Sequence, residues 1–417
     1  MGFIRYYKVC FLVLLITLQI ASVYPRVLVV NQSGEFKSLK IAISKAKSFD
    51  SLVVTKGYYK ESNLNIDKPL TLIGRDYPVI DGTHSNSNIF LVNSSNVIIS
   101  GFIIKNVGVS AVNDNAGIKV SNSTYCKIEK NRLYNTFFGI YLAKSKNCYI
   151  LDNEVVGNGN VESQSGNGIH LWQCSTIVIQ RNKVTQNRDG IYFEFVSNAS
   201  IQFNYSSKNN RYGLHFMFSD NCDYLHNDFV DNGAGVAVMY TKNIKMQNNR
   251  FINNWGASAY GLLLKDIRDS FIYDNEFKNN TIGILAEGSN RLDIKRNNFI
   301  RNGWAVKIMA NCIDDNFTRN NFISNTFDVA TNSKQSYNKF HENYWSEYDG
   351  YDLNHDNYGD VPYHPVSLFS YLTSQNEPAI ILLRSIFINL LDAAEKVFPS
   401  ITPEALVDAK PLMRPIK

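Results

Sequence analysis

Short segments in which apolar and polar residues alternate recur at a nearly constant interval along most of the chain. Most of these segments begin 22 or 23 residues after the previous one. Each opens at a small or compact residue: Gly117, Gly139, Gly168, Gly190, Gly213, Gly235, Gly261, Gly283, Ala305 and Asp328. A fixed interval of this length indicates a solenoid, in which successive coils stack into one continuous core.

Asparagine precedes the small residue at two fixed distances in most coils. The first column comprises Asn131, Asn182, Asn204, Asn227, Asn275, Asn297 and Asn320, and the second comprises Asn187, Asn210, Asn232, Asn280, Asn302 and Asn325. Stacked Asn side chains hydrogen-bond along a ladder, and Asn tolerates left-handed turn backbone. Short strands joined by Asn turns therefore predict an all-β solenoid, a right-handed parallel β-helix with coils of about 22 residues.

The N-terminal residues 1–22 predict a secretory signal peptide. Arg5 and Lys8 precede an apolar stretch over residues 9–20, and small residues follow at Ala21 and Ser22. This stretch is shorter than the ~20 apolar residues that a membrane-spanning helix requires. We therefore expect an exported protein with a periplasmic location and no membrane span of its own.

Residues 23–335 are expected to form the β-helix together with a cap at its N-terminal end. Phe36, Leu39, Ile43 and Ala46 recur at helical spacing, which predicts a short capping helix over the first coils. Residues 336–364 predict an Asp/Asn/Tyr-rich capping loop. Residues 365–417 predict a C-terminal helical docking tail, with an apolar helix over 379–398 that packs on the last coil or on a partner.

Charge and cysteine usage exclude several classes of protein. The net charge is +5 and no long basic run is present, so nucleic acid is not an expected partner. Cys126 and Cys148 both lie nine residues after a small residue and should be neighbours on successive coils. They are either stacked small hydrophobic residues or a disulfide.

The outward positions of the repeated strand form two columns that carry unexpected side chains. The first contains His170, Tyr192 and His215, and the second contains Trp172, Glu194, Met217, Met239 and Met309. Imidazole and thioether ligands together suit a soft ion, above all Cu(I). The pattern therefore gives His170, His215, Met217 and Met239 as candidate copper ligands.

The same face has two other interpretations. Trp172, Tyr192, Glu194 and Met309 would form a docking surface, because exposed apolar side chains attract partners. The last interpretation is that the face has no special role. Docking and metal transfer are compatible with each other.

A segment of the predicted capping loop spaces oxygen-bearing side chains as a calcium loop does. These are Asp352, Asn354, Asp356 and Asp360. Asn357 replaces the glycine of such loops, and a closing bidentate Glu is absent. The alternative is an Asx-rich turn that caps the last coil.

A polysaccharide-cleaving enzyme is the main rival, since such enzymes use this fold. Their chemistry requires carboxylates clustered about 5–10 Å apart or beside a basic residue. Glu194 stands among aromatic and Met positions, and Lys265 with Glu287 indicates a surface ion pair. The outward columns therefore argue against an enzyme, and the loops between coils remain the other place for such a carboxylate cluster.

Several blocks of sequence closely resemble the NosD family. They are RDGIYFEF (188–195), RYGLHFMFS (211–219), GAGVAVMY (233–240), YGLLLKDI (260–267) and NGWAVKIMA (302–310), with residues 351–363 and 411–415. The resemblance implies an exported, non-catalytic maturation factor that assists copper-centre assembly in nitrous oxide reductase. Its implied partners are an ABC-type permease with its ATPase, a copper chaperone lipoprotein and the reductase. The alternative is a secreted carbohydrate-binding or polysaccharide-cleaving β-helix.

Overall fold

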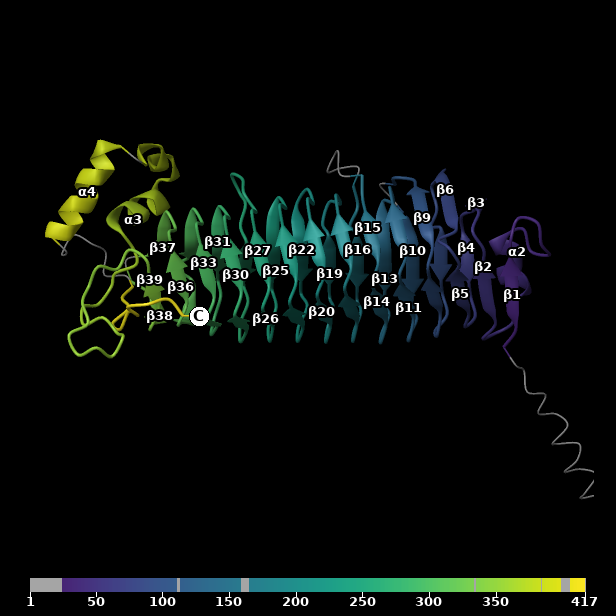
Figure 1. Cartoon of the computed structure of the whole chain (residues 1–417), viewed down its shortest axis with the longest axis horizontal. Coiled ribbons are helices and arrows are strands. Elements are labelled where there is room, and N and C mark those ends of the chain that lie inside the picture. Colours follow the sequence, from purple (N-terminus) through teal and green to yellow (C-terminus); the bar gives the residue numbers. More distant parts are fainter. Residues whose placement is uncertain are drawn as a thin grey trace, which may run out of the picture.

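The protein is a right-handed parallel β-helix of about 13 turns, which confirms the predicted fold class (Figure 1). The computed structural model describes residues 25–110, 113–158, 165–333, 335–383, 385–398 and 406–416. The signal peptide expected at residues 1–22 lies outside the described residues.

The described strands form three long parallel sheets that run the length of the coil stack. The 14-stranded sheet contains β1 (Val27–Val30), β2 (Ser51–Val54), β5 (Thr71–Gly74), β8 (Ile98–Ser100), β11 (Lys127–Glu129), β14 (Tyr149–Leu151), β17 (Val178–Gln180), β20 (Ser200–Gln202), β23 (Asp223–Leu225), β26 (Lys245–Gln247), β29 (Phe271–Tyr273), β32 (Asp293–Lys295), β35 (Ile313–Thr318) and β38 (Tyr337–His341). The 13-stranded sheet contains β3 (Tyr58–Lys60), β6 (Val79–Ser85), β9 (Ile103–Val107), β12 (Arg132–Tyr134), β15 (Glu154–Val156), β18 (Lys183–Thr185), β21 (Tyr205–Ser207), β24 (Asp228–Val230), β27 (Arg250–Ile252), β30 (Glu276–Lys278), β33 (Asn298–Ile300), β36 (Asn321–Ile323) and β39 (Tyr344–Trp345). The 12-stranded sheet carries the repeated segments of the sequence and contains β4 (Leu64–Ile66), β7 (Phe90–Val92), β10 (Ala116–Ser121), β13 (Phe138–Ala143), β16 (Ile169–Trp172), β19 (Ile191–Glu194), β22 (Tyr212–Met217), β25 (Ala234–Met239), β28 (Leu262–Lys265), β31 (Ile282–Glu287), β34 (Trp304–Ile308) and β37 (Phe327–Thr331).

The core is a continuous column of apolar side chains enclosed by these sheets. Ile191 and Phe193 of β19 are fully buried, and their register partners Leu214 and Phe216 on β22 are buried as well. Aromatic rings stack along the inside of the 13-stranded sheet at centroid spacings of 4.1 to 5.5 Å. The stacked rings belong to Phe229, Phe251, Phe277, Phe299, Phe322 and Trp345.

The first Asn column forms a hydrogen-bonded ladder along the coil stack. In each step the side-chain oxygen of one Asn accepts from the backbone and side-chain N–H groups of the Asn on the preceding coil, as Asn227 does from Asn204. The ladder runs through Asn131, Asn153, Asn182, Asn204, Asn227, Asn249, Asn275, Asn297, Asn320 and Asn343. It satisfies buried backbone groups at every turn, which is why Asn recurs there.

The second Asn column also forms a ladder, but the prediction for Asn210 is wrong. Asn209 occupies the ladder position, where its side-chain oxygen accepts from the backbone N–H of Asn187, while Asn210 is exposed. This coil is 23 residues long, so the extra residue falls between the ladder position and the small residue Gly213. Counting three residues back from Gly213 therefore gives Asn210, which is next to the true ladder residue, Asn209.

The N-terminal end is covered by the expected short helix, α2 (Leu39–Lys45), at the purple end of the molecule (Figure 1). Leu39, Ala42 and Ile43 face the core, and the hydroxyl of Ser38 accepts from the backbone N–H of Ile41 at 3.4 Å. The carboxylate of Glu61 accepts from the first N–H groups of the helix, at Leu39 and Lys40. These contacts cap the helix and seal the first coils.

The C-terminal segment is helical in three short pieces rather than one helix over 379–398. They are α3 (Leu368–Gln375), the 3₁₀ helix η2 (Glu377–Leu382) and α4 (Ile386–Val397). Ser385 begins α4, because its hydroxyl accepts from the backbone N–H of Ile388 at 3.4 Å. No helix in the described ranges is long and apolar enough to cross a membrane.

The last described residues, 406–416, return to the end of the coil stack. Asp408 pairs with Phe340 of β38, and Leu412 pairs with Tyr344 of β39. One carboxylate oxygen of Asp408 accepts from the backbone and side chain of Asn343 and from Nε1 of Trp345. Asp408 thus completes the Asn ladder at its C-terminal end.

Candidate functional site

The two outward columns lie on one face of the 12-stranded sheet, as the alternation predicts. His170, Tyr192 and His215 are register partners on β16, β19 and β22, and Ala237 of β25 follows. The second column runs in the same register through Trp172, Glu194, Met217 and Met239. Met309 follows the end of β34, three strands beyond β25, so the structure does not bring it to this group.

The first column is largely buried rather than exposed. His215 is 6% exposed, and Ala237 and Leu263 are also buried. The aromatic side chains of Tyr212, the first residue of β22, and Tyr260, which precedes β28, pack with Ala237 and Leu263 in a small outer cluster. The second column is half-buried, so its Met and Glu side chains form the accessible edge of this face.

Rings of the first column pack against one another from coil to coil, with His170 stacked on Tyr192 and the other two pairs edge to face. The centroid of His170 lies 4.5 Å from that of Tyr141 and 4.7 Å from that of Tyr192, and Tyr192 lies 5.0 Å from His215. The ring of Tyr192 therefore separates the two histidines, and the structure does not place His170 beside His215. Nδ1 of His170 is 3.0 Å from Nδ2 of Asn167, and burial, helped by the charge of Arg188, lowers the pKa of His170 to about 3. His170 is therefore a neutral, hydrogen-bonded part of the stack at neutral pH.

His215, Met217 and Met239 are the three candidate ligands that the structure does bring together. His215 and Met217 lie two residues apart on the same side of β22, and Met217 is the register partner of Met239. The hydroxyl of Tyr192 lies 3.9 Å from Sδ of Met217. Both ring nitrogens of His215 are buried without a hydrogen-bond partner among the described residues. We call His215, Met217 and Met239 the His/Met cluster.

The His/Met cluster fits a soft monovalent ion. Thioether and imidazole donors select Cu(I), and an imidazole nitrogen that has no hydrogen bond keeps its lone pair for a ligand. Within the described ranges no three His, Cys, Asp or Glu side chains come together to hold a metal. A metal site on this face therefore depends on the methionine sulfurs.

Asp189 belongs to this region and was missed by the sequence reasoning. It lies directly before Gly190 and β19, is fully buried, and places Oδ2 3.6 Å from Nδ1 of His215. Nε of Arg211 lies 3.8 Å from its other oxygen. The signal for it was present, because an acidic residue precedes the small residue of the repeated segment only in this coil.

The remaining docking candidates flank the His/Met cluster. Trp172 and Glu194 are register partners, and Glu194 is also the partner of Met217. Nζ of Lys144 lies 5.2 Å from the centroid of the Trp172 ring. Trp172, Tyr192 and Glu194 therefore form one continuous patch beside the cluster.

The side-chain oxygen atoms of the calcium-like segment of the capping loop accept hydrogen bonds from backbone N–H groups of the same loop. The two carboxylate oxygens of Asp352 accept from the backbone N–H groups of Asp356 and Asn357, and Asp360 accepts from Leu353. Asn354 and Asp356 accept from backbone N–H groups two residues ahead. This is the pattern of an Asx-rich turn, and it leaves calcium binding without support.

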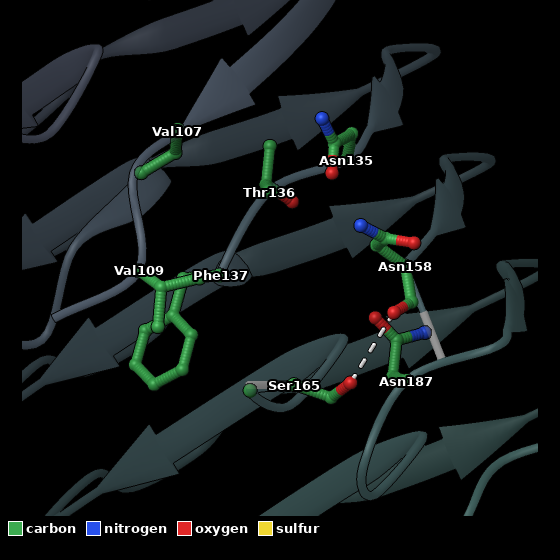
Figure 2. Close-up of a pocket in the computed structure, with 10 residues that line it drawn as sticks. Val107, Val109, Asn135, Thr136, Phe137, Asn158, Ser165 and Asn187 are labelled. Atoms are coloured by element: carbon green, nitrogen blue, oxygen red, sulfur yellow. Dashed lines mark hydrogen bonds between the residues drawn. The ribbon is translucent and has the colours of Figure 1, made fainter. Parts of the chain in front are cut away.

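A small pocket opens where the turns between the 13-stranded and 12-stranded sheets stack (Figure 2). It has a volume of about 40 Å³, and Val107, Thr136 and Asn187 are among its lining residues. Figure 2 shows the Ser165 hydroxyl near Asn158, where it donates to the backbone oxygen at 3.5 Å. The space suits a few water molecules, and its lining contains no carboxylate, so it lacks the groups that glycosidic cleavage requires.

The described cysteines are all buried and free. Cys126, Cys148, Cys174, Cys222 and Cys312 face the interior of the coil stack. Cys126 and Cys148 are neighbours on successive coils, as the spacing predicts, and they are stacked thiols in this structure.

Comparison with known proteins places these features in context. Residues 62–163 and 151–350 match the family described as "Periplasmic copper-binding protein (NosD)". A relative from Pseudomonas aeruginosa, named a probable ABC transporter binding protein NosD, is 29% identical over 84% of this chain and 86% of its own length. A relative of the same name from Stutzerimonas stutzeri is 25% identical over 85% of each chain.

Solved structures share the architecture at low identity. The A-module of mannuronan C-5 epimerase AlgE6 from Azotobacter vinelandii matches with a TM-score of 0.52 at 14% identity, covering 73% of this chain and 95% of that module. An α-1,3-glucanase from Streptomyces thermodiastaticus also matches with a TM-score of 0.52, at 11% identity over 76% of this chain and 64% of its own. Likeness at this level shows the parallel β-helix and nothing of the chemistry.

Proposed function

Because this chain belongs to the NosD family of periplasmic copper-binding proteins, we propose that it is a non-enzymatic accessory protein for copper-centre assembly in nitrous oxide reductase. It acts in the periplasm as the partner of an ABC-type permease and its ATPase, receives copper from a chaperone lipoprotein, and passes it to the reductase. Copper is its cargo, held transiently. The observation that carries the proposal is the His/Met cluster on the half-buried outer face.

Three features support copper handling by the His/Met cluster. Nε2 of His215 is without a hydrogen bond in the described chain, so this nitrogen is available to bind an ion. Met217 and Met239 are adjacent on neighbouring strands and half-buried, which permits an ion to enter and leave. Trp172, Tyr192 and Glu194 beside the cluster offer a surface on which a copper donor or acceptor would dock.

The experiment is an anaerobic Cu(I) titration in competition with a chromophoric chelator. We expect His215→Ala, Met217→Ala and Met239→Ala each to weaken binding at least tenfold, which corresponds to about 1.4 kcal/mol. Met309→Ala is the matched control, because Met309 is an outward methionine away from the cluster and should bind as the wild type does. The variants His215→Ala, Met217→Ala and Met239→Ala should also reduce the copper content of nitrous oxide reductase in cells.

Equal Cu(I) affinity in all four variants would contradict the metal role. The outer face would then be a docking surface, with copper held by the partners. The β-helical glycan-acting enzymes share the fold alone, so no observation on the outer face favours the carbohydrate alternative.

We also propose that the C-terminal helices dock on the permease. Ile381 of η2 and Ile386 and Leu390 of α4 are 86%, 79% and 64% exposed, an unusual concentration of exposed apolar side chains. The relatives' name as ABC transporter binding proteins supports a permease as the covering partner.

A further inference from the structure

An acidic residue at position 189 is not required by the fold. The residue before the small residue that opens each repeated segment is apolar, aromatic or an amide in the other coils: Ala116, Phe138, Asn167, Tyr212, Ala234, Tyr260, Ile282, Trp304 and Phe327. Asp189 alone in this row carries a carboxylate, and it is fully buried. Burying a carboxylate is costly unless charges and hydrogen bonds compensate, so its presence calls for a specific partner.

The contacts of Asp189 leave one of its oxygens available. Oδ1 accepts from the backbone N–H of Tyr212 at 3.4 Å and lies 3.8 Å from Nε of Arg211. Oδ2 lies 4.0 Å from Nε of Arg188 and accepts no hydrogen bond within the described part of the chain. The arginines balance the charge of the carboxylate, but they do not satisfy Oδ2.

Two buried nitrogens without hydrogen-bond partners lie beside Oδ2, and the nearer one belongs to the imidazole of His215 while the other is Nε of Arg188. Nδ1 of His215 lies 3.6 Å from Oδ2, slightly beyond hydrogen-bond length. The ring is packed by Tyr192 at 5.0 Å and Tyr212 at 4.7 Å between centroids, so the two tyrosines limit its rotation. A buried carboxylate oxygen and a buried imidazole therefore face each other, and neither has a hydrogen-bond partner in the described structure.

We propose that Asp189 is a positioning residue for His215. The Nδ1–H group of His215 donates to Oδ2 of Asp189, which fixes the tautomer in which Nε2 keeps its lone pair. A carboxylate in this position orients an imidazole ligand and makes its other nitrogen a stronger donor to a metal. This inference rests on the proposed function, in which Nε2 of His215 together with Met217 and Met239 takes Cu(I).

The tautomer can be measured on metal-free protein. Protein labelled with ¹⁵N-histidine, held at pH 8 so that free imidazole is neutral, gives long-range ¹H–¹⁵N correlations that distinguish the two tautomers. The His215 signals are assigned by their loss in His215→Ala. We expect the wild type to carry its proton on Nδ1, and a proton on Nε2 would overturn the proposal. This measurement needs no Asp189 variant.

The Cu(I) affinity supplies the second readout. We expect Asp189→Asn to lower the affinity for Cu(I) by about 10- to 100-fold and to shift His215 toward the Nε2–H tautomer. Asp228→Asn is the matched control, because Asp228 also lies near an arginine, 3.5 Å from Arg250, but on the 13-stranded sheet. An unchanged affinity in Asp189→Asn, or an equal loss in Asp228→Asn, would overturn the proposal.

The two proposals fail in distinguishable ways. If His215→Ala binds Cu(I) as tightly as the wild type, the metal role of His215 fails whatever the tautomer is. If His215→Ala loses affinity but Asp189→Asn does not, only the positioning role of Asp189 fails.

Discussion

At the scale of single residues, Asp328 takes a place that other coils give to Gly or Ala. Its carboxyl accepts from Nδ2 of Asn325 at 3.2 Å and from the hydroxyl of Tyr363 at 3.4 Å. Burial, only partly offset by the Asn325 hydrogen bond, raises the pKa of Asp328 to about 7. The folded protein therefore holds this group protonated under conditions in which the unfolded chain ionises it.

This raised pKa predicts that the protein loses stability as the pH rises. An unfolded Asp has a pKa near 3.9, so the contribution of Asp328 is complete below about pH 4 and is lost as the pH rises through about 7. We expect the free energy of unfolding to fall by about 2–3 kcal/mol between pH 5 and pH 8. Burial raises the pKa of Asp315 to about 6, and this group adds to the same trend.

Denaturant unfolding at pH 5 to 8 measures this effect. Asp328→Asn should remove the part of the pH dependence due to Asp328, because the amide does not ionise, and should leave the smaller part due to Asp315. Asp269→Asn is the control, since hydrogen bonds from Arg291 lower the pKa of this half-buried carboxyl still further below the tested range. A wild-type pH dependence in Asp328→Asn would contradict the prediction.

The alternation of apolar and polar residues along the strands was sufficient to place His215, Met217 and Met239 on one face. It could not show that His215 is buried, because alternation does not reveal that the ring of Tyr212, at the start of β22, packs against His215 at 4.7 Å between centroids. It also missed Asp189, whose role depends on a contact between successive coils. Residues within a strand are thus predictable from the period, whereas residues in turns are not, since turn length varies from coil to coil.

At the scale of elements, packing decides which face of α4 is buried against the coil stack and which face is exposed. Ile388 is buried against Phe327 and Phe369, where the helix meets the last strand of the 12-stranded sheet and α3. Ile386 and Leu390 lie on the exposed side of the same helix. The sequence predicted an apolar helix in this region, but the break before Ser385 reflects a local cap that the hydrophobic pattern did not reveal.

We expect Ile386→Ser combined with Leu390→Ser to weaken binding to the permease at least tenfold without destabilising the coils. Both side chains are exposed, so their loss removes contact area with a partner but little core packing. Ile41→Ser is the matched control, because Ile41 is an exposed isoleucine on α2 at the opposite end. Binding is measured with the permease in detergent, and an undiminished affinity would remove the docking role of α4.

At the scale of the whole molecule, the two ends of the coil stack are closed differently. A short helix covers the N-terminal end, while residues 406–416 add to the sheets at the other end and Asp408 terminates the Asn ladder (Figure 1). The period in the sequence predicted the long middle of this structure. It could not predict that Asp408 returns to Asn343, because that contact joins residues 65 positions apart with no repeat between them.

Asp408→Ala should destabilise the protein by about 2–4 kcal/mol. The change removes the acceptor of three buried N–H groups on Asn343 and Trp345, and each buried donor without a partner is costly. Asp408→Asn keeps an acceptor oxygen and should lose much less stability. Thermal unfolding of the two variants compares them, and equal losses would show that the ladder terminus is not what Asp408 stabilises.

The strand order of the 12-stranded sheet also fixes the distance between the His/Met cluster and the C-terminal helices. Five strand steps separate β22, which carries His215 and Met217, from β37 beside the C-terminal helices. Parallel strands lie about 4.8 Å apart, so the His/Met cluster stands about 24 Å from that end. If α4 docks on the permease as proposed, the number of coils would set the height of the His/Met cluster above that docking site. An inserted coil would raise this height by one strand spacing and leave the chemistry of the His/Met cluster untouched.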